Sequence, residues 1–351
     1  MHKVVLLSFI CLCCISFVFS QDTSHTRSLK ILPVPTIGYS PETRTYVGAV
    51  TLFTFNIHND SATRTSNAEV EFNYTWNKQL ILEAGWNYFS KHEKWFTKGL
   101  IHYSKFPDLY YGIGPATPEA NKLVFNSNRF VIETAVLKRT GKKIFSGLNF
   151  KYINYSRVNT STVNINYPEL GASSTLGLGC TVLKDTRNKL LTPSSGMYVY
   201  GNSSYNMSQS NYWEFTLDVR YYKTWNNKFT WANRLINDWS VGTPPFYDYA
   251  FLGGDKLVRG YYFGRYRDNN LCAWQTEFRL PVVGRLGLAT LGGLSALYSA
   301  QNVLMFQHLR YNYGVGIRFK VDKKENTNLR FDYALGNYPN SGFYVSFGES
   351  F

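Results

Sequence analysis

The strongest constraint on the fold is a strict alternation of side chains along segments of about ten residues. Large apolar residues take every second position, and charged, polar or very small residues take the positions between them. The clearest cases are residues 70–76, 213–221, 311–321 and 329–335. Because successive side chains of a β-strand point to opposite faces of the sheet, each segment predicts a strand with one apolar and one polar face.

The alternation, together with turn residues between the segments, predicts about 16 strands, an even number that is typical of transmembrane barrels. An apolar face turned to lipid and a polar face turned to a lumen would account for the pattern. The predicted fold class is therefore all-β, a transmembrane antiparallel β-barrel. A soluble β-sandwich is the alternative, and it would be expected to contain more proline and fewer long segments. The expected strands are residues 31–39, 45–57, 67–76, 79–90, 94–106, 128–140, 143–156, 172–183, 196–205, 210–223, 228–239, 270–281, 284–298, 308–320, 326–335 and 341–351.

Composition agrees with an exported β-rich protein. The 351 residues include 27 Tyr and 25 Phe but only 12 Pro, and the formal net charge is +14. After residue 20, no apolar run approaches the 18 or so residues that a helical span needs. In a cytosolic protein the positive charge would suggest a nucleic acid partner. In an exported barrel it suggests a basic lumen and contact with anionic headgroups, so we expect outer-membrane lipid and no nucleic acid among the partners.

The first residues predict a cleaved secretory signal peptide. A positive charge, an apolar run and a small residue before a polar one follow in that order within residues 1–21. An uncleaved N-terminal membrane anchor is the alternative. The expected organisation is a signal peptide at 1–20, a short segment at 21–30 and one barrel domain at 31–351.

Nothing in the sequence favours an enzyme. Only Cys180 and Cys272 remain after the signal peptide, without disulfide or metal-binding spacing. We find no Ser/His/Asp spacing, and the GxG fragments at 112–114 and 177–179 do not precede helices as phosphate-binding turns do. We therefore expect no catalytic residue, no metal and no cofactor.

The connections divide into long and short ones. If both termini are periplasmic, the long connections 107–127 and 240–269 face outside, whereas short ones such as 140–143 and 223–228 face the periplasm. This asymmetry is typical of outer-membrane barrels. The second long connection contains FLGGDKLVRGYYFGRYRD, residues 251–268, which is rich in glycine, basic residues and aromatics.

This loop carries a family resemblance. Residues 257–261, Leu-Val-Arg-Gly-Tyr, resemble the VRGF/VRGY signature of the BamA/TamA superfamily of outer-membrane assembly and translocation barrels, the bacterial surface antigen type. Further similarities lie in Leu252–Gly254, Gly264–Asp268, Glu277–Arg279 and the terminal Phe351. The resemblance covers the expected barrel but no periplasmic POTRA domain, so a POTRA-less member with separate partner subunits is expected.

The resemblance implies that the 240–269 loop folds into the lumen as a latch. Val258, Arg259, Gly260 and Tyr261 would form its tip, with Arg259 paired to Glu277 on the neighbouring wall, because an arginine fork matches a carboxylate. The sequence departs from the family where a second acid is expected and has Gly292 and Gly293 instead. Asp332, two strands further on and facing the lumen, is the expected substitute. Without the family, Arg259 could equally be a solvated loop residue.

The resemblance also implies a weak closing seam between the first and last strands. Pro33 and Pro35 both lack an N–H donor on one edge of the first strand. Gly342 and Gly348 would weaken the last strand, which is expected to end in Phe351 at the seam. The alternative is that the prolines merely lead into the strand.

These features predict a barrel that assembles, inserts or translocates outer-membrane proteins through a lateral seam, with protein clients and partner subunits. The alternative is a passive porin for small anionic solutes, in which the loop is a constriction. Lumen charges such as Arg220, Arg318 and Lys320 would then select anions.

Overall fold

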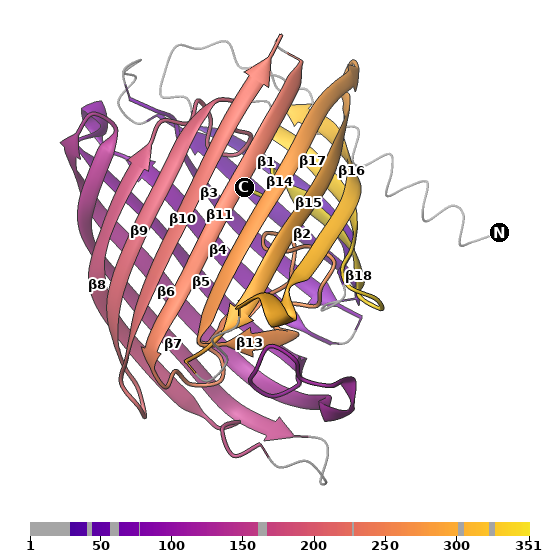
Figure 1. Cartoon of the computed structure of the whole chain (residues 1–351). Coiled ribbons are helices and arrows are strands. Elements are labelled where there is room, and N and C mark those ends of the chain that lie inside the picture. Colours follow the sequence, from indigo (N-terminus) through magenta and orange to yellow (C-terminus); the bar gives the residue numbers. More distant parts are fainter. Residues whose placement is uncertain are drawn as a thin grey trace.

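The computed structural model describes residues 29–40, 44–56, 63–76, 78–160, 167–226, 228–300, 305–322 and 327–351. In this part of the chain, 16 strands form one antiparallel sheet that curves into a barrel (Figure 1). The strands follow chain order around the wall, and a separate two-stranded hairpin lies between β11 and β14 in the sequence. The expected signal peptide and most of the segment at 21–30 lie outside the described residues.

The all-β barrel predicted from the sequence is confirmed, with the strands in the predicted order. The inner hairpin consists of β12 Ala250–Leu252 and β13 Tyr266–Asp268, and the 3-10 helices are η1 Lys91–Glu93, η2 Glu119–Asn121 and η3 Met305–His308. The wall strands are β1 Lys30–Ser40, β2 Arg44–Phe55, β3 Ser66–Thr75, β4 Leu80–Phe89, β5 Trp95–Tyr110, β6 Leu123–Gly141, β7 Ile144–Thr160, β8 Ser173–Asp185, β9 Gly196–Met207, β10 Tyr212–Trp225, β11 Phe229–Gly242, β14 Asn270–Val283, β15 Leu286–Tyr298, β16 Arg310–Asp322, β17 Thr327–Leu335 and β18 Ser341–Phe347.

The connection between β5 and β6 is shorter than predicted, because β5 continues through Pro107 to Tyr110. A predicted strand is normally ended before a proline, because proline has no N–H to donate to a ladder hydrogen bond. Here the Pro107 carbonyl accepts a hydrogen bond from the Gln79 side chain (3.1 Å), so the backbone of Pro107, including its nitrogen, points to the β4 side of the strand. The β4–β5 ladder has already ended at Lys105. The missing N–H therefore interrupts no ladder.

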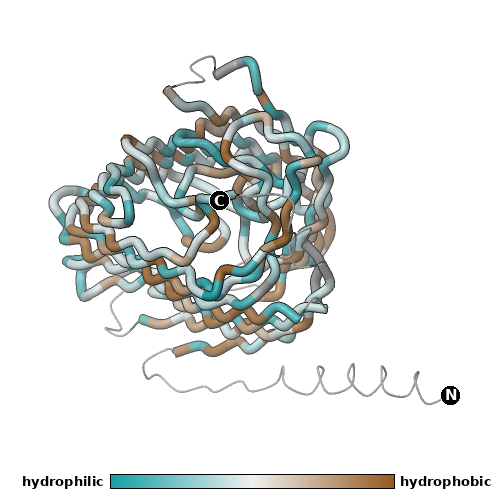
Figure 2. The backbone as a smooth tube through the Cα atoms, turned by 90° about the horizontal axis from the view of Figure 1, so that it is seen from below, coloured by the Kyte–Doolittle hydropathy of each residue, from teal (hydrophilic) through white to brown (hydrophobic). Residues whose placement is uncertain are grey.

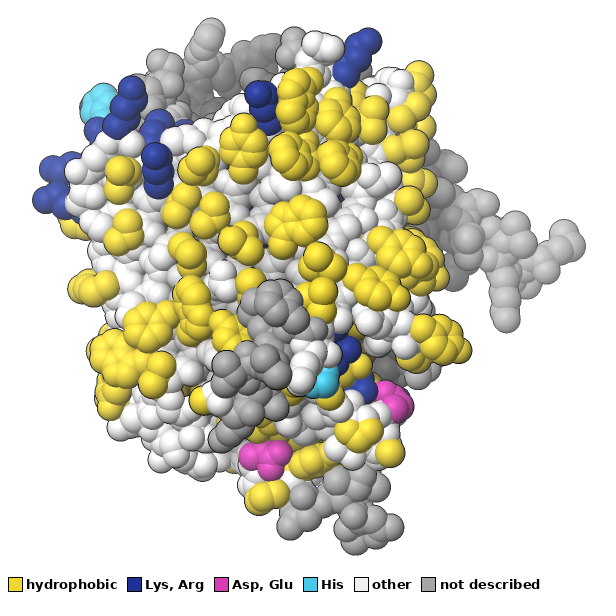
Figure 3. Space-filling model, viewed as in Figure 1, with side chains coloured by type: hydrophobic (Ala, Val, Ile, Leu, Met, Phe, Trp, Pro, Cys, Tyr) yellow, Lys and Arg dark blue, Asp and Glu magenta, His cyan; other side chains and the backbone are white. Residues whose placement is uncertain are grey.

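The predicted alternation separates an apolar outside from a polar inside. In β3, Val70, Phe72 and Tyr74 are 44–47% exposed, whereas Asn73 and Thr75 on the other face of the strand are buried. Aromatic and aliphatic side chains cover much of the outer surface in the same way (Figure 3). Such a continuous apolar exterior is the surface expected of a wall in contact with lipid.

The two ends of the barrel differ in their connections. One end, here called the turn end, carries mostly short connections, such as 142–143, 226–228 and 284–285. The other end, the loop end, carries the long ones, including the segment of residues 243–269 between β11 and β14. The turn end is at the top of Figure 1 and the inner hairpin lies near the bottom.

The 243–269 segment, here called the inner loop, packs inside the barrel. Its buried residues Leu252, Val258, Tyr261 and Tyr266 form one apolar cluster with wall residues of β11, β14 and β15. Figure 2, a view from the loop end, shows the C-terminal end of the chain inside the ring of strands as well. No helix among the described residues is long and apolar enough to cross a membrane.

Candidate functional site: an internal latch beside an unpaired sheet edge

The tip of the inner loop approaches the wall through Gly260. Its φ of +106° lies in the left-handed region, where a side chain would be strained. A Cβ built on Gly260 would lie 2.8 Å from the Leu335 carbonyl carbon of β17. The Gly260 N–H donates a hydrogen bond to the Tyr344 hydroxyl of β18 (3.0 Å). Only a glycine lets the loop backbone lie this close to the β17–β18 hairpin.

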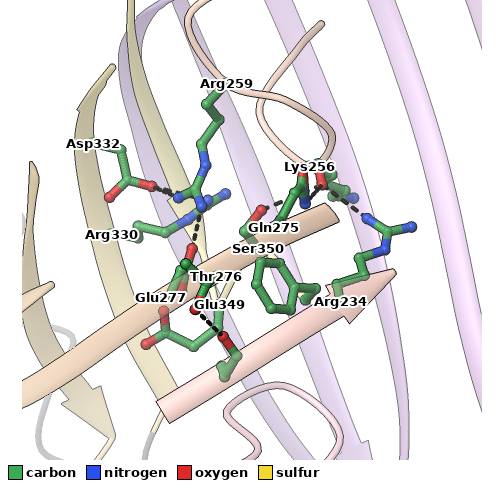
Figure 4. A network of polar contacts seen from close by, with 12 residues as sticks. Arg234, Lys256, Arg259, Gln275, Thr276, Glu277, Arg330, Asp332, Glu349 and Ser350 are labelled. Atoms are coloured by element: carbon green, nitrogen blue, oxygen red, sulfur yellow. Dashed lines mark hydrogen bonds and ion pairs between the residues drawn. The ribbon is translucent and has the colours of Figure 1, made fainter. Parts of the chain in front are cut away.

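Arg259 projects from this tip between two carboxylates of the wall (Figure 4). Its guanidinium hydrogen-bonds Glu277 of β14 through one terminal nitrogen and Asp332 of β17 through the other. All three side chains are at most 3% exposed. The side chains named from the sequence thus meet in one place, with Asp332 as the second acid.

Further arginines surround the same carboxylates. Arg279 donates to Glu277 (2.8 Å) and Arg330 to Asp332 (3.0 Å). Arg330 also pairs with Asp255 of the inner loop (3.2 Å). We call the set the latch cluster; it comprises Asp255, Arg259, Glu277, Arg279, Arg318, Arg330, Asp332 and Glu349.

The latch cluster is balanced in charge, because its four guanidinium groups face four carboxylates. Burial alone would lower the pKa of Arg259, but Glu277 and Asp332 outweigh this effect and raise the pKa above its ordinary value. Arg259 is therefore a permanent cation. Removing it would leave two buried carboxylates without their central partner.

The residues on either side of Arg259 fix the loop tip. The Val258 N–H donates to the Gln275 side chain of β14, which points into the lumen from the same face as Glu277. The buried Tyr261 donates its hydroxyl proton to the Tyr311 carbonyl (2.8 Å). Apolar burial and hydrogen bonds therefore hold the tip in addition to the ion pairs.

Sequence reasoning missed several members of the cluster. Arg318 was considered only as an anion-attracting lumen charge, yet it is 4% exposed and donates to Asp332 and Glu349. Arg220 likewise pairs with Asp218 (2.6 Å). Alternation along the strands places Arg318 and Arg330 in the lumen, but their partners depend on the shape of the barrel.

The edge of β1 that faces away from β2 can be identified from one backbone bond. The Thr45 carbonyl of β2 accepts a hydrogen bond from the Trp76 N–H (2.9 Å), so Thr45 faces β3. Thr45 lies opposite Tyr39 of β1, and the register continues without a shift. Opposite residues of an antiparallel pair alternate between hydrogen-bonded and non-bonded pairs. Because the backbone groups of Thr45 point to β3, Tyr39 and Thr45 are a non-bonded pair. The backbone groups of Tyr39, and of Pro35 and Pro33 at every second position before it, therefore point away from β2. Both missing N–H groups lie on the edge toward β18.

The same reasoning orients β18. The Asn340 carbonyl accepts from the Gly336 N–H (2.9 Å), and the Gly348 N–H donates to the Asn328 carbonyl (2.8 Å). Both bonds are directed toward β17, so the even-numbered residues between them, including Gly342, also face β17. Gly342 and Gly348 thus belong to the β17–β18 ladder and remove no donor from the edge toward β1.

The edge of β18 toward β1 is formed by Phe343, Val345 and Phe347. The Val345 carbonyl accepts a hydrogen bond from the Tyr46 hydroxyl of β2 (3.2 Å), a side chain that reaches past β1. In the part of the chain that the structure describes, no ladder joins β1 to β18, and these two strands are the ends of the sheet order. We call this the unpaired edge.

Residues 348–351 turn into the lumen, which corrects the prediction that the last strand extends to residue 351. Gly348, with a φ of +74°, permits the change of direction. Phe351 is 3% exposed and packs against Tyr222 of β10. Arg279 donates to the Phe351 carbonyl (3.1 Å). Phe351 therefore lies against the opposite wall and not at the seam, because burial and this hydrogen bond hold it inside.

This C-terminal tail, residues 348–351, connects the unpaired edge to the latch cluster. The Glu349 carboxylate accepts hydrogen bonds from Arg318 and from Asn328 (both 2.8 Å). The Ser350 hydroxyl donates to the Asp255 carbonyl of the inner loop (3.1 Å). The strand that borders the unpaired edge is thus continuous with a segment bound inside the lumen.

A cavity of about 540 Å³ lies between these elements. Its lining includes Pro35 of β1, Val345 of β18, Glu69 of β3, Glu83 of β4 and Lys256 of the inner loop. No group of three or more His, Cys, Asp or Glu among the described residues could hold a metal ion. Because Pro35 and Val345 line it, the cavity reaches the unpaired edge from the inside.

A second buried charge cluster ties the turn end. Arg64, between β2 and β3, pairs with Glu93 (3.1 Å) and with Asp185 at the end of β8 (3.1 Å). Lys143 pairs with Glu93 (3.0 Å) and Arg187 with Asp185 (2.9 Å). This turn-end cluster, which the sequence did not suggest, joins four successive connections of the N-terminal half.

Comparison with solved structures shows a shared fold. BamA from Haemophilus ducreyi lacking POTRA domains 1–3 has a TM-score of 0.60 and 12% identity, over 93% of this chain and 71% of that chain. CdiB from Acinetobacter baumannii has a TM-score of 0.55 and 11% identity, over 91% and 65%. CdiB from Escherichia coli has a TM-score of 0.56 and 9% identity, over 92% and 67%.

No curated protein matches the sequence significantly. A protein-family model described as the Omp85 superfamily domain matches residues 39–351. This match includes nearly all of the wall, the inner loop and the C-terminal tail. The chain therefore belongs to the Omp85 superfamily.

Proposed function

We propose that this protein inserts or translocates polypeptides at the outer membrane through the unpaired edge, with the inner loop as an internal latch. Membership of the Omp85 superfamily supports an outer-membrane barrel of the insertion or translocation type. Client proteins and partner subunits that deliver them are part of the proposal.

One observation carries the proposal: among the described residues β1 and β18 share no ladder, and both prolines of β1 face that edge. A backbone edge with free groups can pair with an added strand of another chain. The cavity beside the edge gives such a strand access to the lumen. The latch cluster then ties the inner loop to β14 and β17 while β1 moves.

The test locks the edge. In a Cys180→Ser/Cys272→Ser background, Thr36→Cys is combined with Ser346→Cys, because both positions line the cavity on either side of the edge. The matched control is Thr181→Cys with Asn202→Cys, which are opposite residues of the regular β8–β9 ladder. The levels of other outer-membrane proteins are measured in cells that depend on each variant.

Oxidation of the edge pair is expected to lower these levels, and a reductant should restore them, whereas the ladder control should remain active. Normal activity of the oxidised edge pair would exclude lateral opening. Unchanged levels of every other barrel after depletion of the protein itself would exclude the insertion role. A passive porin would instead show steady conductance that increases when the inner loop is deleted.

A further inference from the structure

The exposed charges of the barrel are distributed unequally between its two ends. Lysine and arginine side chains gather at the turn end in Figure 3, and aspartate and glutamate appear on that face only near the loop end. Exposed cations of the turn end include Lys94, Lys138, Arg139, Lys184, Lys223 and Arg285. Among the side chains that the structure describes, no aspartate or glutamate of this end is exposed.

The asymmetry has a structural cause. The carboxylates present at the turn end, Glu93, Asp185 and Glu349, are at most 3% exposed and are held in ion pairs. Because these carboxylates are paired with cations inside the barrel, their negative charge does not neutralise the lysines on the rim. The rim therefore presents a net positive potential to its surroundings.

Three of these cations point outward at the limit of the apolar band. Lys138 follows the outward-facing Val136 by two positions in β6, and Lys184 follows Val182 in the same way in β8. Lys223 follows Tyr221 in β10. Side chains two apart share a face of a strand, so each lysine continues the lipid-facing row by one step.

Aromatic side chains accompany these lysines. Lys138 lies opposite the exposed Trp95 of β5 in the ladder. The Lys223 Nζ lies 5.5 Å from the centre of the Trp225 ring, which is also exposed. Tryptophan favours the boundary between hydrocarbon and headgroups, and a lysine there extends its ammonium group toward the phosphates.

We propose that this turn-end rim, centred on Lys138, Lys184 and Lys223, binds the phosphate groups of anionic phospholipids in the adjacent leaflet. An acidic protein would also be attracted by the charge. The outward direction of these three side chains and their place beside membrane-boundary tryptophans favour lipid. The proposal concerns the outer surface and does not depend on the unpaired edge or on the latch cluster.

The test measures lipid selectivity of the full chain in phosphatidylcholine vesicles that contain a trace of spin-labelled phosphatidylglycerol or phosphatidylcholine. The rim variant is Lys138→Gln/Lys184→Gln/Lys223→Gln. The matched control removes three exposed cations near the loop end, Lys78→Gln/Lys105→Gln/Arg157→Gln. Both variants are first checked for the heat-dependent gel mobility of a folded barrel.

The wild type and the control are expected to restrict the motion of phosphatidylglycerol about fivefold more strongly than that of phosphatidylcholine. The rim variant should lose this preference, and high salt should reduce it in the wild type. A rim variant that keeps the full preference would overturn the proposal. So would a rim variant that loses only the binding of soluble polyglutamate, because the surface would then serve an acidic protein.

Discussion

The two buried charge clusters of this barrel differ in what they connect. The turn-end cluster joins connections between β2 and β9, strands that continuous ladders already link. The latch cluster joins the inner loop, the C-terminal tail and the wall next to β18. Beyond β18, the described part of the chain has no ladder to β1.

From this difference we expect a structural role for the turn-end cluster and a conformational role for the latch cluster. Breaking the turn-end cluster leaves every neighbouring strand paired, so its loss should lower the free energy of unfolding without releasing a segment. Breaking the latch cluster frees two segments that no wall ladder holds. Changes in the latch cluster should therefore affect loop position and activity before they affect the barrel itself.

The largest effect is expected for Arg259→Ala. It leaves Glu277 and Asp332 buried without the cation between them, and loss of one partner of a buried pair costs about 3–5 kcal/mol. The inner loop should leave its place in the lumen and become sensitive to added protease. Levels of other outer-membrane proteins should fall, as measured by immunoblotting.

Two further variants test whether this effect belongs to the latch. Arg259→Lys keeps the charge but not the two-pronged geometry, so it should restore loop protection only in part. Arg64→Ala in the turn-end cluster should leave the inner loop protected. A loop that is equally protease-resistant in wild type and in Arg259→Ala would contradict the latch.

Gly260→Ala should loosen the same loop by a steric route. The added Cβ would meet the Leu335 carbonyl carbon at 2.8 Å in a backbone conformation that disfavours side chains, a strain of about 1–3 kcal/mol. Gly171→Ala is the control, because a Cβ there meets nothing within 4 Å. Hydrogen exchange of residues 255–262 should increase in the first variant only. Equal exchange in both would mean that the close approach does not position the tip.

The turn-end cluster should make stability depend on pH. Burial tends to raise the pKa of Glu93, but Arg64 and Lys143 outweigh it and lower the pKa below 4.5. A depressed folded-state pKa contributes stability that is fully present above the unfolded value and is lost as pH falls through the folded value. Urea unfolding in detergent should show this loss below about pH 4.5.

Glu93→Gln should remove most of that dependence and cost about 1–3 kcal/mol near pH 7, because Arg64 and Lys143 lose their charged partner. The proposed insertion activity should remain. A variant that keeps the slope of wild type between pH 3 and pH 5 would assign the titration to another carboxylate.

Much of this architecture could be predicted, because the alternation of side chains with a period of two residues is a local property of the sequence. Alternation placed Glu277 and Asp332 in the lumen, and the loop signature drew attention to Arg259. The turn-end cluster could not be predicted in this way. Arg64 meets Asp185 only because four connections converge at one end of a curved wall.

The C-terminal tail illustrates the same limit. Phe351 looks like the end of an alternating strand, and only Gly348 signals a change of direction. Whether the chain turns inward depends on the hydrogen-bond donors inside the lumen, chiefly Arg279 and Arg318. Which edge of β1 carries the prolines can likewise be determined only from a hydrogen bond that its neighbour β2 makes.

The smallest effect is expected at the prolines of the unpaired edge. Pro33→Val and Pro35→Val each restore an N–H donor toward β18, and a hydrogen bond contributes about 0.5–1.5 kcal/mol. The double variant should close the edge partly and slow insertion without altering the latch. Pro281→Val, an exposed proline of β14 away from this edge, is the control. Because a partly closed edge brings β1 nearer to β18, the double-proline variant should raise the rate of crosslinking between residues 36 and 346. If the double-proline variant crosslinked no faster than Pro281→Val, the missing donors would not be what keeps the edge open.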